Sequence, residues 1–464
     1  MPWKRRGAVL WIIGLVLSAG LVPARAADTP TGTQVPVAVD TIVREAMAAG
    51  PIVGLSIAAS RGGRLLFAAG YGLADLENGV PATPATIYHF GSIAKPFTAA
   101  AVVQLVEAGK MGLEDELTKF LPSYPVQGHR VTIQHLLHHT SGIKNYLLLP
   151  RWQEAVRLDL THDQLVGLFR NEPFDFPPGD KFSYTNSGYY LLGLVIEQAA
   201  GQSYPEYLKA RVFDPLGLAQ TAYCEQRPVI KGRARGYDVL DGVVLNAEYF
   251  SMTHAYSAGA VCGSALDLLT WVRALAEGRL VSKDGFRRMS VAGTLTDGTQ
   301  IEYGQGLALS SVEGHPRVSH VGGIRGFASQ FAHYPDDDLT VVVLTNTENA
   351  KAATIEARIS RALLGLPPPG PERVVLSKPE LDYYTGTYDL GFAKVTVVER
   401  DGKLVVEATS LLGNEGYKLT PEGDHKFVAD EDSEVRVTFE LRERRVRRMV
   451  VYRKGITMRA DRVQ

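Results

Sequence analysis

A run of four prolines and a glycine, Pro367–Pro371, divides the chain into two parts with different patterns. Proline fixes φ and has no N–H to donate, so neither a helix nor a central strand continues through this segment. Before it, helical and strand-like stretches alternate. After it, short strands follow one another closely. We therefore predict two domains, residues 35–365 and 380–464, joined by a linker over residues 366–379.

The composition is that of an ordinary globular protein. Of 464 residues, 45% are hydrophobic and 21% are charged, which excludes a disordered, collagen-like or coiled-coil chain. The 49 Lys and Arg residues nearly balance the 50 Asp and Glu residues. Such a balance gives no electrostatic reason to expect nucleic acid or an anionic membrane as a partner. It leaves the oligomeric state open.

The first residues have the features of an export signal. Three basic residues, Lys4–Arg6, precede an apolar run over residues 8–22, and the small-x-small sequence Ala24–Ala26 follows. This order predicts a signal peptide, residues 1–26, that is removed on export. The alternative is an uncleaved N-terminal anchor. With cleavage we expect an exported protein, periplasmic or secreted, with no stable membrane span.

The sequence contains two cysteines, Cys224 and Cys262. In an oxidising compartment an even pair is a candidate disulfide. Because sequence alone does not show that their Cα atoms lie close enough, two buried free thiols remain the alternative.

The part before the prolines contains antiparallel hairpins. Two strand-like runs, residues 53–59 and 65–71, are separated by a Gly62–Gly63 turn, which predicts a hairpin and not a βαβ unit. A second hairpin is predicted with strands over residues 327–334 and 339–345.

Helices lie between and beside these hairpins. They are predicted over residues 37–49, 92–108 and 350–364. The middle, residues 112–290, is loop-rich and helical, with Thr132 and Thr161 as helix N-caps. We therefore predict an α+β fold, in which an antiparallel sheet is flanked by helices and carries an inserted helical subdomain.

The part after the prolines has the pattern of a small all-β domain. The turn Asp401–Gly402 between two apolar runs is a strong signal for a type I′ hairpin. About eight short strands in under a hundred residues predict an up-and-down β-barrel or a sandwich. The cationic stretch Leu441–Arg448 spans a predicted turn there, and we interpret it as a solvated face.

Several common catalytic motifs are missing. The sequence has no G-x-S-x-G, no H-E-x-x-H, no G-x-x-x-x-G-K-[ST] and no G-x-G-x-x-G after a strand. These absences argue against an α/β-hydrolase, a zincin and a nucleotide-binding protein, and we expect no cofactor.

Ser92 and Lys95 form an S-x-x-K pattern at the start of a predicted helix. This spacing places the two side chains one turn apart on the same face. A buried neutral lysine can take the serine proton, because loss of solvation lowers the pKa of an amine. Alone the pattern is weak, and the chain has a second match, Ser141–Lys144, in a loop. We expect that second match to be accidental.

Two further segments carry suitable chemistry. Tyr184-Thr185-Asn186 offers a phenol that can shuttle a proton and an amide that can orient a lysine or a carbonyl. His320-Val321-Gly322-Gly323 precedes a predicted strand, and its glycines allow a main-chain N–H to approach a ligand closely. His320 would add a donor or a partial positive charge.

In this order and spacing, the three segments resemble the motifs of penicillin-recognising serine hydrolases: class C β-lactamases, DD-peptidases and related esterases. Four more segments strengthen the resemblance, namely Tyr88–Gly91, Leu136–Gly142, Phe182–Leu192 and Gly323–Phe327. It covers residues 35–365. The segment Tyr384–Tyr388 is similar to the start of the lipocalin-like domain that follows in some members.

The resemblance implies roles for each residue. Ser92 would be the nucleophile, Lys95 its activating partner, and Tyr184 the general base and acid. Asn186, His320, Gly322 and Gly323 would contact substrate, with the N–H groups of Ser92 and Gly323 forming an oxyanion hole.

The third motif departs from the family pattern. Lactamases usually have Lys where this chain has His320, and Val321 lacks the usual hydroxyl that helps to hold a substrate carboxylate. This favours D-amino-acid peptides, amides or esters as substrates over β-lactams. The main alternative is a penicillin-binding or sensing protein that acylates without turnover.

A metal hydrolase is the remaining hypothesis. His135, His138 and His139 form an H-x-x-H-H cluster at helical spacing. The cluster lacks the glutamate of an H-x-x-E-H site and has no evident third ligand. We therefore expect two structural histidines and one exposed histidine, with no metal.

Overall fold

The computed structural model describes residues 31–32, 34–240, 242–368, 376–390, 393–407, 416–423, 425–430, 432, 435–442, 445–453 and 456–463. The predicted signal peptide and residues 369–375 of the predicted linker lie outside these residues. Among the described residues, no helix is long and apolar enough to cross a membrane.

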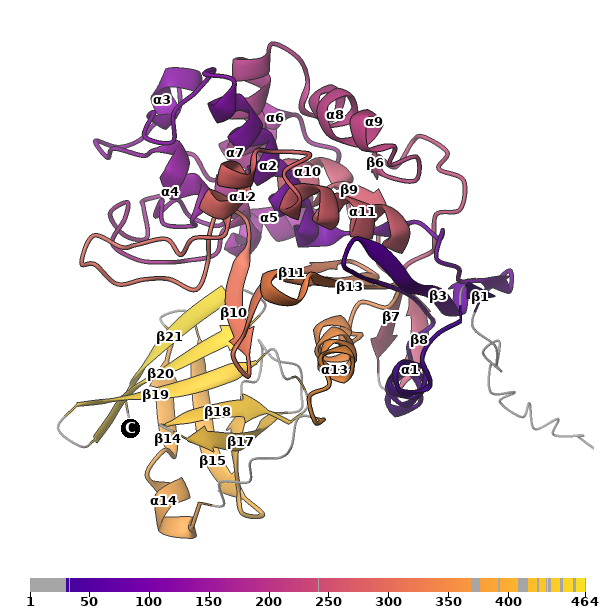
Figure 1. Ribbon diagram of the computed structural model, residues 1–464. Helices are drawn as coiled ribbons and strands as arrows, with labels where there is room; N and C mark the ends of the chain where they lie inside the picture. The colour runs from indigo at the N-terminus through magenta and orange to yellow at the C-terminus, as the bar shows by residue number, and fades with distance from the viewer. Residues whose placement is uncertain are drawn as a thin grey trace, which may run out of the picture.

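An eight-stranded antiparallel sheet forms the centre of the first part (Figure 1). Its path is β1-β3-β2-β13-β12-β11-β10, and β4 pairs with β3. The strands are β1 (Thr31–Gly32), β2 (Gly54–Arg61), β3 (Arg64–Asp75), β4 (Val80–Pro81), β10 (Ala308–Val312), β11 (His315–Ile324), β12 (Phe327–Tyr334) and β13 (Leu339–Thr345). Both predicted hairpins are present. They meet in the middle of the sheet, where β13 pairs with β2.

Helices cover both faces of this sheet. On β13, Val341 and Val343 belong to the core shared with α1 (Val37–Ala49) and α13 (Ala352–Leu364). The alternate residue Val342 belongs to the core shared with the other helices. This alternation follows from the two-residue period of a strand. The helices on the second face are α2 (Ala94–Glu107), α11 (Ala265–Ala276) and α12 (Lys283–Met289).

The middle of the chain forms the predicted helical subdomain, at the top of Figure 1. Its helices are α3 (Leu117–Phe120), α4 (Ile133–Leu137), α5 (Pro150–Ala155), α6 (His162–Gly167), α7 (Asn186–Ala200), α8 (Tyr204–Leu208), α9 (Asp214–Leu216) and α10 (Met252–Gly259). Thr132 and Thr161 are the N-caps of α4 and α6, as predicted, and each takes part in a capping box.

Two small sheets connect the subdomain to the large sheet. One has the order β5 (Tyr88–His89), β9 (Val261–Gly263), β6 (Ala222–Tyr223), and the other pairs β7 (Tyr237–Leu240) with β8 (Val243–Asn246). Cys224 and Cys262 form a disulfide, with Cα atoms 5.6 Å apart. Because His89 pairs with Cys262, this bond braces the strand that leads into the Ser92 segment.

The second part is a closed barrel of eight described strands, which decides between the two predicted all-β folds. The strands are β14 (Gly386–Asp389), β15 (Lys394–Arg400), β16 (Lys403–Glu407), β17 (Tyr417–Gly423), β18 (Lys426–Ala429), β19 (Arg436–Arg442), β20 (Arg445–Arg453) and β21 (Ile456–Arg462), and α14 (Lys378–Asp382) precedes them. Asp401 and Gly402 both have positive φ, as a type I′ turn requires. Pairing of β14 with β21 closes the barrel.

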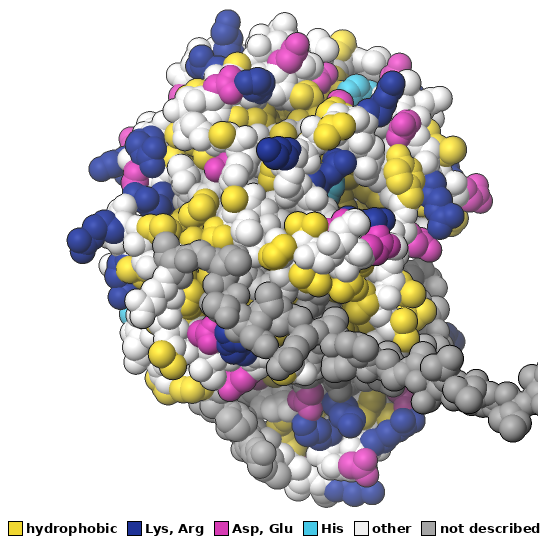
Figure 2. Space-filling view, turned by 90° about the vertical axis from the view of Figure 1, so that its right-hand side faces the viewer, with side chains coloured by type: hydrophobic (Ala, Val, Ile, Leu, Met, Phe, Trp, Pro, Cys, Tyr) yellow, Lys and Arg dark blue, Asp and Glu magenta, His cyan; other side chains and the backbone are white. Residues whose placement is uncertain are grey.

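Charged side chains of both signs are interspersed on the face shown in Figure 2. This distribution agrees with the near-zero net charge of the chain. In the cationic stretch of the barrel, Arg448 pairs with Asp461 at 2.7 Å and with Glu440 at 3.6 Å.

Candidate active site

Ser92 lies in a short 3-10 turn, Gly91–Ile93, directly before α2. The predicted helix over residues 92–108 therefore begins as this tighter turn, and Pro96 is accommodated in the first turn of α2, where no N–H is needed. Ser92 is half-buried, whereas Lys95 is fully buried one turn further on.

Lys95 is held by three oxygen atoms from three elements. Its Nζ lies 3.0 Å from Ser92 Oγ, 2.8 Å from Asn186 Oδ1 and 2.9 Å from the carbonyl oxygen of Ala258. Asn186 is the first residue of α7, and Ala258 follows the kink that Tyr256 makes in α10 with a φ of 37°.

Removal from water holds the pKa of Lys95 well below its usual value. A neutral amine has two hydrogens and one lone pair. The Asn186 and Ala258 oxygens can only accept hydrogen bonds, so they take both hydrogens. The lone pair of Nζ is then left for the Ser92 hydroxyl, which is the arrangement that a general base needs.

Tyr184 lies against Lys95, with Nζ 4.7 Å from the centre of its ring. Burial raises the pKa of this phenol far above its usual value, and the nearby Ser92 hydroxyl partly opposes that shift. Its buried hydroxyl has no hydrogen-bond partner among the described residues. The resting tyrosine is therefore a protonated phenol with a free donor beside Ser92.

The glycines of the third motif allow β11 to approach the segment before Ser92. A Cβ on Gly322 would lie 2.0 Å from the carbonyl oxygen of Phe90, and one on Gly91 would lie 2.8 Å from the carbonyl oxygen of Gly323. The Ser329 hydroxyl donates to the same Phe90 oxygen at 2.7 Å and holds the strands together. The backbones at Ser92 and Gly323 are thus brought next to each other.

His320 lies within β11, the strand that precedes the predicted strand β12, and it belongs to a hydrogen-bonded chain. Thr185 N–H donates to His139 Nδ1 at 3.1 Å, so the His139 proton is on Nε2, which faces the Tyr303 hydroxyl at 3.4 Å. Tyr303 in turn lies 2.9 Å from His320 Nε2. The other ring nitrogen, Nδ1, lies 2.7 Å from the carbonyl oxygen of Val321 and must donate to it.

This chain of hydrogen bonds fixes His320 as a neutral ring with both nitrogens in use. Burial, and repulsion from the Lys95 amine whenever it is protonated, lower the pKa of His320 to about 3. The expected positive charge at His320 is therefore absent near neutral pH. Sequence analysis did not identify Tyr303, because no motif marks it. Its position between two histidines arises only from the fold.

The remaining histidines of the H-x-x-H-H cluster have structural surroundings, and the expectation of one exposed histidine was wrong, because His135 is half-buried and the other two are buried. His135 Nδ1 accepts from Thr132 N–H in the capping box of α4, and His138 is buried. Within the described part of the chain, no group of three or more His, Cys, Asp or Glu residues is arranged to hold a metal ion.

The fold and the Ser-Lys-Tyr arrangement agree with the protein family that the sequence matches. The beta-lactamase family model matches residues 39–365, so the chain belongs to the beta-lactamase family, whose serine hydrolases include penicillin-binding and D-amino-acid-processing enzymes.

Particular relatives extend this result. Penicillin-binding protein 4* of Bacillus subtilis is 30% identical to this chain. The aligned region covers 86% of this chain and 93% of that protein. A D-aminopeptidase of Gluconobacter oxydans is 28% identical to this chain, and the aligned region covers 68% of this chain and 60% of that protein. Among solved structures, the octameric penicillin-binding protein homologue from Pyrococcus abyssi superposes with a TM-score of 0.67 at 25% identity, over 91% of this chain and 99% of that one. A D-stereospecific amidohydrolase from Streptomyces has a TM-score of 0.60, also at 25% identity, over 71% and 99%.

Proposed function

We propose that this protein is an exported serine hydrolase that forms an acyl-enzyme on Ser92 and cleaves peptides or amides of D-amino acids. The observation that carries the proposal is the position of the Lys95 amine, which has its lone pair free for the Ser92 hydroxyl. The D-aminopeptidase and D-stereospecific amidohydrolase relatives support the substrate class.

Acylation would begin when Lys95 Nζ takes the Ser92 proton and Oγ bonds to the substrate carbonyl carbon. The resulting oxyanion would be held by the N–H groups of Ser92 and Gly323. Tyr184 would then donate its phenolic proton to the leaving nitrogen as the C–N bond breaks. The protonated Lys95 beside its ring would stabilise the phenolate that forms.

Deacylation would reverse these transfers with water in place of the amine. The Tyr184 phenolate takes a proton from water, and the hydroxide bonds to the acyl carbon. The Ser92 oxygen leaves and recovers its proton from Lys95. All groups return to their starting states, so no other reactant is needed.

The third motif supports the preference for D-amino-acid substrates over β-lactams. Val321 offers no hydroxyl, and the neutral His320 offers no charge to a substrate carboxylate. The same catalytic group would also cleave an ester, whose alcohol leaves more easily than an amine.

The test is turnover together with intact-protein mass. We expect D-phenylalanine amide to be hydrolysed over many turnovers, with no activity in Ser92→Ala. A lasting benzylpenicillin adduct on Ser92, without turnover of amides or esters, would instead establish a penicillin-binding sensor. Turnover of p-nitrophenyl acetate but of no amide would establish an esterase.

Export is part of the proposal. The Cys224–Cys262 disulfide supports it, because such bonds persist in oxidising compartments. We expect the mature protein to begin at Ala27 in an envelope or secreted fraction, as read by mass spectrometry. A chain that retains residues 1–26 would contradict cleavage.

A further inference from the structure

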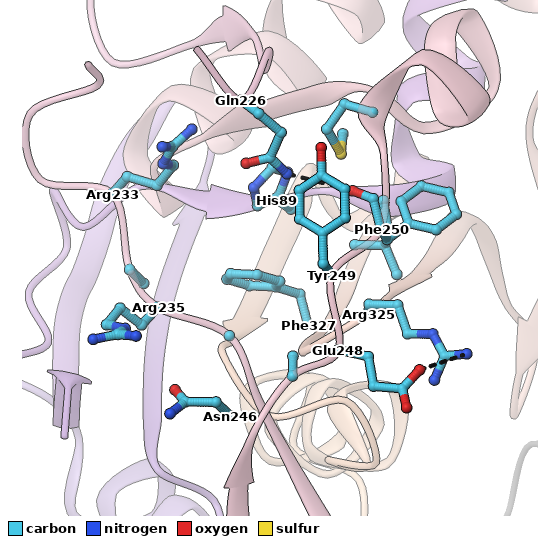
Figure 3. A pocket seen from close by; sticks show the side chains of 15 residues that line it. His89, Gln226, Arg233, Arg235, Asn246, Glu248, Tyr249, Phe250, Arg325 and Phe327 are labelled. Carbon is cyan, nitrogen blue, oxygen red and sulfur yellow. Dashed lines mark hydrogen bonds and ion pairs between the residues drawn. The ribbon is translucent and has the colours of Figure 1, made fainter. Parts of the chain in front are cut away.

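A pocket of about 240 Å³ is lined by residues that lie close in the sequence to two residues of the proposed active site (Figure 3). His89 of β5, Arg233 of the loop before β7, Ile324 of β11 and Phe327 of β12 contribute to its lining. His89 is three residues before Ser92, and Ile324 directly follows Gly323. Three residues span at most about 10 Å. The pocket is therefore within reach of one substrate whose scissile carbonyl lies at Ser92.

His89, which lines this pocket, has a buried polar atom without a partner. The side chain is 8% exposed, and its Nδ1 has no hydrogen-bond partner among the described residues. The other ring nitrogen lies 3.9 Å from Cys224 Sγ, which has no hydrogen to donate because it is in a disulfide. The Phe327 ring lies 4.9 Å from the His89 ring and holds it in place. A disulfide sulfur only accepts, so this contact places the ring proton on Nε2. Because the contact is weak, a bound carboxylate can move the proton to Nδ1, which then donates to it.

Arg233 supplies a positive charge next to His89. Its guanidinium donates to the backbone oxygen of Glu225 at 3.1 Å, and no carboxylate among the described residues pairs with it. In Figure 3 the side chain extends toward Gln226 and His89.

The two other arginines of the lining are already paired. Arg235 turns away from the centre of the pocket and forms an ion pair with Glu77. Arg325 lies 3.8 Å from Glu248. Arg233 is thus the arginine of this lining without a carboxylate partner, and His89 has one ring nitrogen without a hydrogen bond, so a bound carboxylate satisfies both.

We propose that this pocket is a substrate subsite that binds a carboxylate group, held by Arg233 and His89 beside the ring of Phe327. The inference rests on the proposed function. It gives the site a charge that His320 and Val321 do not provide. A volume of about 240 Å³ accommodates a group of the size of an amino-acid side chain. We therefore expect the substrate to be an acylated D-amino-acid derivative with an acidic end.

The test compares two ligands that differ in a carboxylate. Succinyl-D-phenylalanine amide and acetyl-D-phenylalanine amide are titrated by calorimetry into the full mature chain with Ser92→Ala, so that neither is consumed. We expect the succinyl compound to bind about tenfold more tightly, as befits a charge-assisted hydrogen bond. Adding Arg233→Gln or His89→Gln should bring the two affinities within about twofold of each other.

Arg235→Gln is the matched control, because it removes a lining arginine whose charge is already paired. We expect it to keep the preference for the succinyl compound. Thermal denaturation of each variant shows that it is folded. Two ligands of equal affinity, or a preference that survives Arg233→Gln, would overturn the subsite.

Free succinate separates a subsite from an effector site. Succinate should compete with the succinyl compound and leave binding of the acetyl compound unchanged, which supports the subsite. Succinate that binds without competing with the succinyl compound would mark a separate effector site and overturn the inference. If neither amide binds and wild-type protein hydrolyses no D-amino-acid amide, the proposed function fails, and the inference fails with it.

Discussion

Two segments of this chain carry the same Ser-x-x-Lys pattern in very different surroundings. Lys95 is fully buried, and its Nζ meets only neutral oxygens, one of them the Ser92 hydroxyl. Lys144 is partly exposed and pairs with Asp175 at 2.5 Å, while Ser141 accepts from the N–H of Ile143 within a loop. An ion pair stabilises an ammonium, whereas burial among neutral groups destabilises it. The pattern acquires the surroundings that the proposed catalysis needs only where the fold removes the lysine from water and from any carboxylate.

The largest expected effect tests whether the two serines differ as this comparison requires. Ser92→Ala should lower kcat/KM by about 10⁴-fold or more, because no covalent intermediate forms. Ser141→Ala should leave kcat/KM within about twofold, since it removes only a loop hydrogen bond. Steady-state hydrolysis of D-phenylalanine amide measures both. Comparable losses in the two variants would break the comparison.

The two lysines give the next largest difference. Lys95→Met keeps an unbranched chain but removes the base, and we expect kcat to fall by about 10³-fold. Lys144→Met loses a surface ion pair, so the free energy of unfolding should fall by less than about 1 kcal/mol with kcat unchanged. Kinetics and urea denaturation on the same samples separate the two effects. A Lys95→Met enzyme with wild-type kcat would refute the proposed base.

The pH dependence sharpens the comparison without mutation. Burial lowers the pKa of Lys95, and only the neutral amine accepts the serine proton. The ratio kcat/KM should therefore be constant above that pKa and fall about tenfold per pH unit below it. His320, whose pKa is lowered to about 3, should not contribute a step near neutral pH. A profile that instead required protonation of an amine at neutral pH would contradict a neutral Lys95.

The smallest expected effect concerns Tyr303. Tyr303→Phe leaves the His139 N–H without an acceptor and His320 Nε2 without a donor. We expect the free energy of unfolding to fall by about 1–3 kcal/mol, the usual cost of unpaired buried polar groups. We also expect kcat/KM to fall several-fold, and the nitrogen shifts of His320 in NMR spectra to report a changed tautomer. Unchanged His320 shifts would show that Tyr303 does not fix this ring.

Local signals predicted much of the fold. The hairpins of the large sheet, the capping boxes at Thr132 and Thr161 and the Asp401–Gly402 turn depend on neighbouring residues, so the sequence contains their causes. The choice between barrel and sandwich depends on pairing of β14 with β21, strands more than sixty residues apart, and no local pattern encodes it.

The candidate site was likewise predictable where local spacing identifies its residues, and not where it depends on distant parts of the chain. Ser92, Lys95 and Tyr184 were identified through their spacing and order, and the structure brings them together. The neutral state of His320 was not predicted, because it depends on burial and on the contact with Tyr303, which no motif marks. The pocket beside Arg233 arises in the same way, from a loop, two strands and a disulfide that meet only in the folded chain.

The central pairing of the large sheet has a consequence for how the chain is made. Ala59 of β2 lies opposite Val341 of β13, about 280 residues later. At ordinary rates of synthesis, roughly 15 to 55 seconds pass between the emergence of the two strands from the ribosome. During this time the edge of β2 that pairs with β13 has no hydrogen-bonding partner. The helical subdomain, whose contacts are more local, can form first. Nascent chains stalled before residue 339 should therefore be the species that most needs a chaperone.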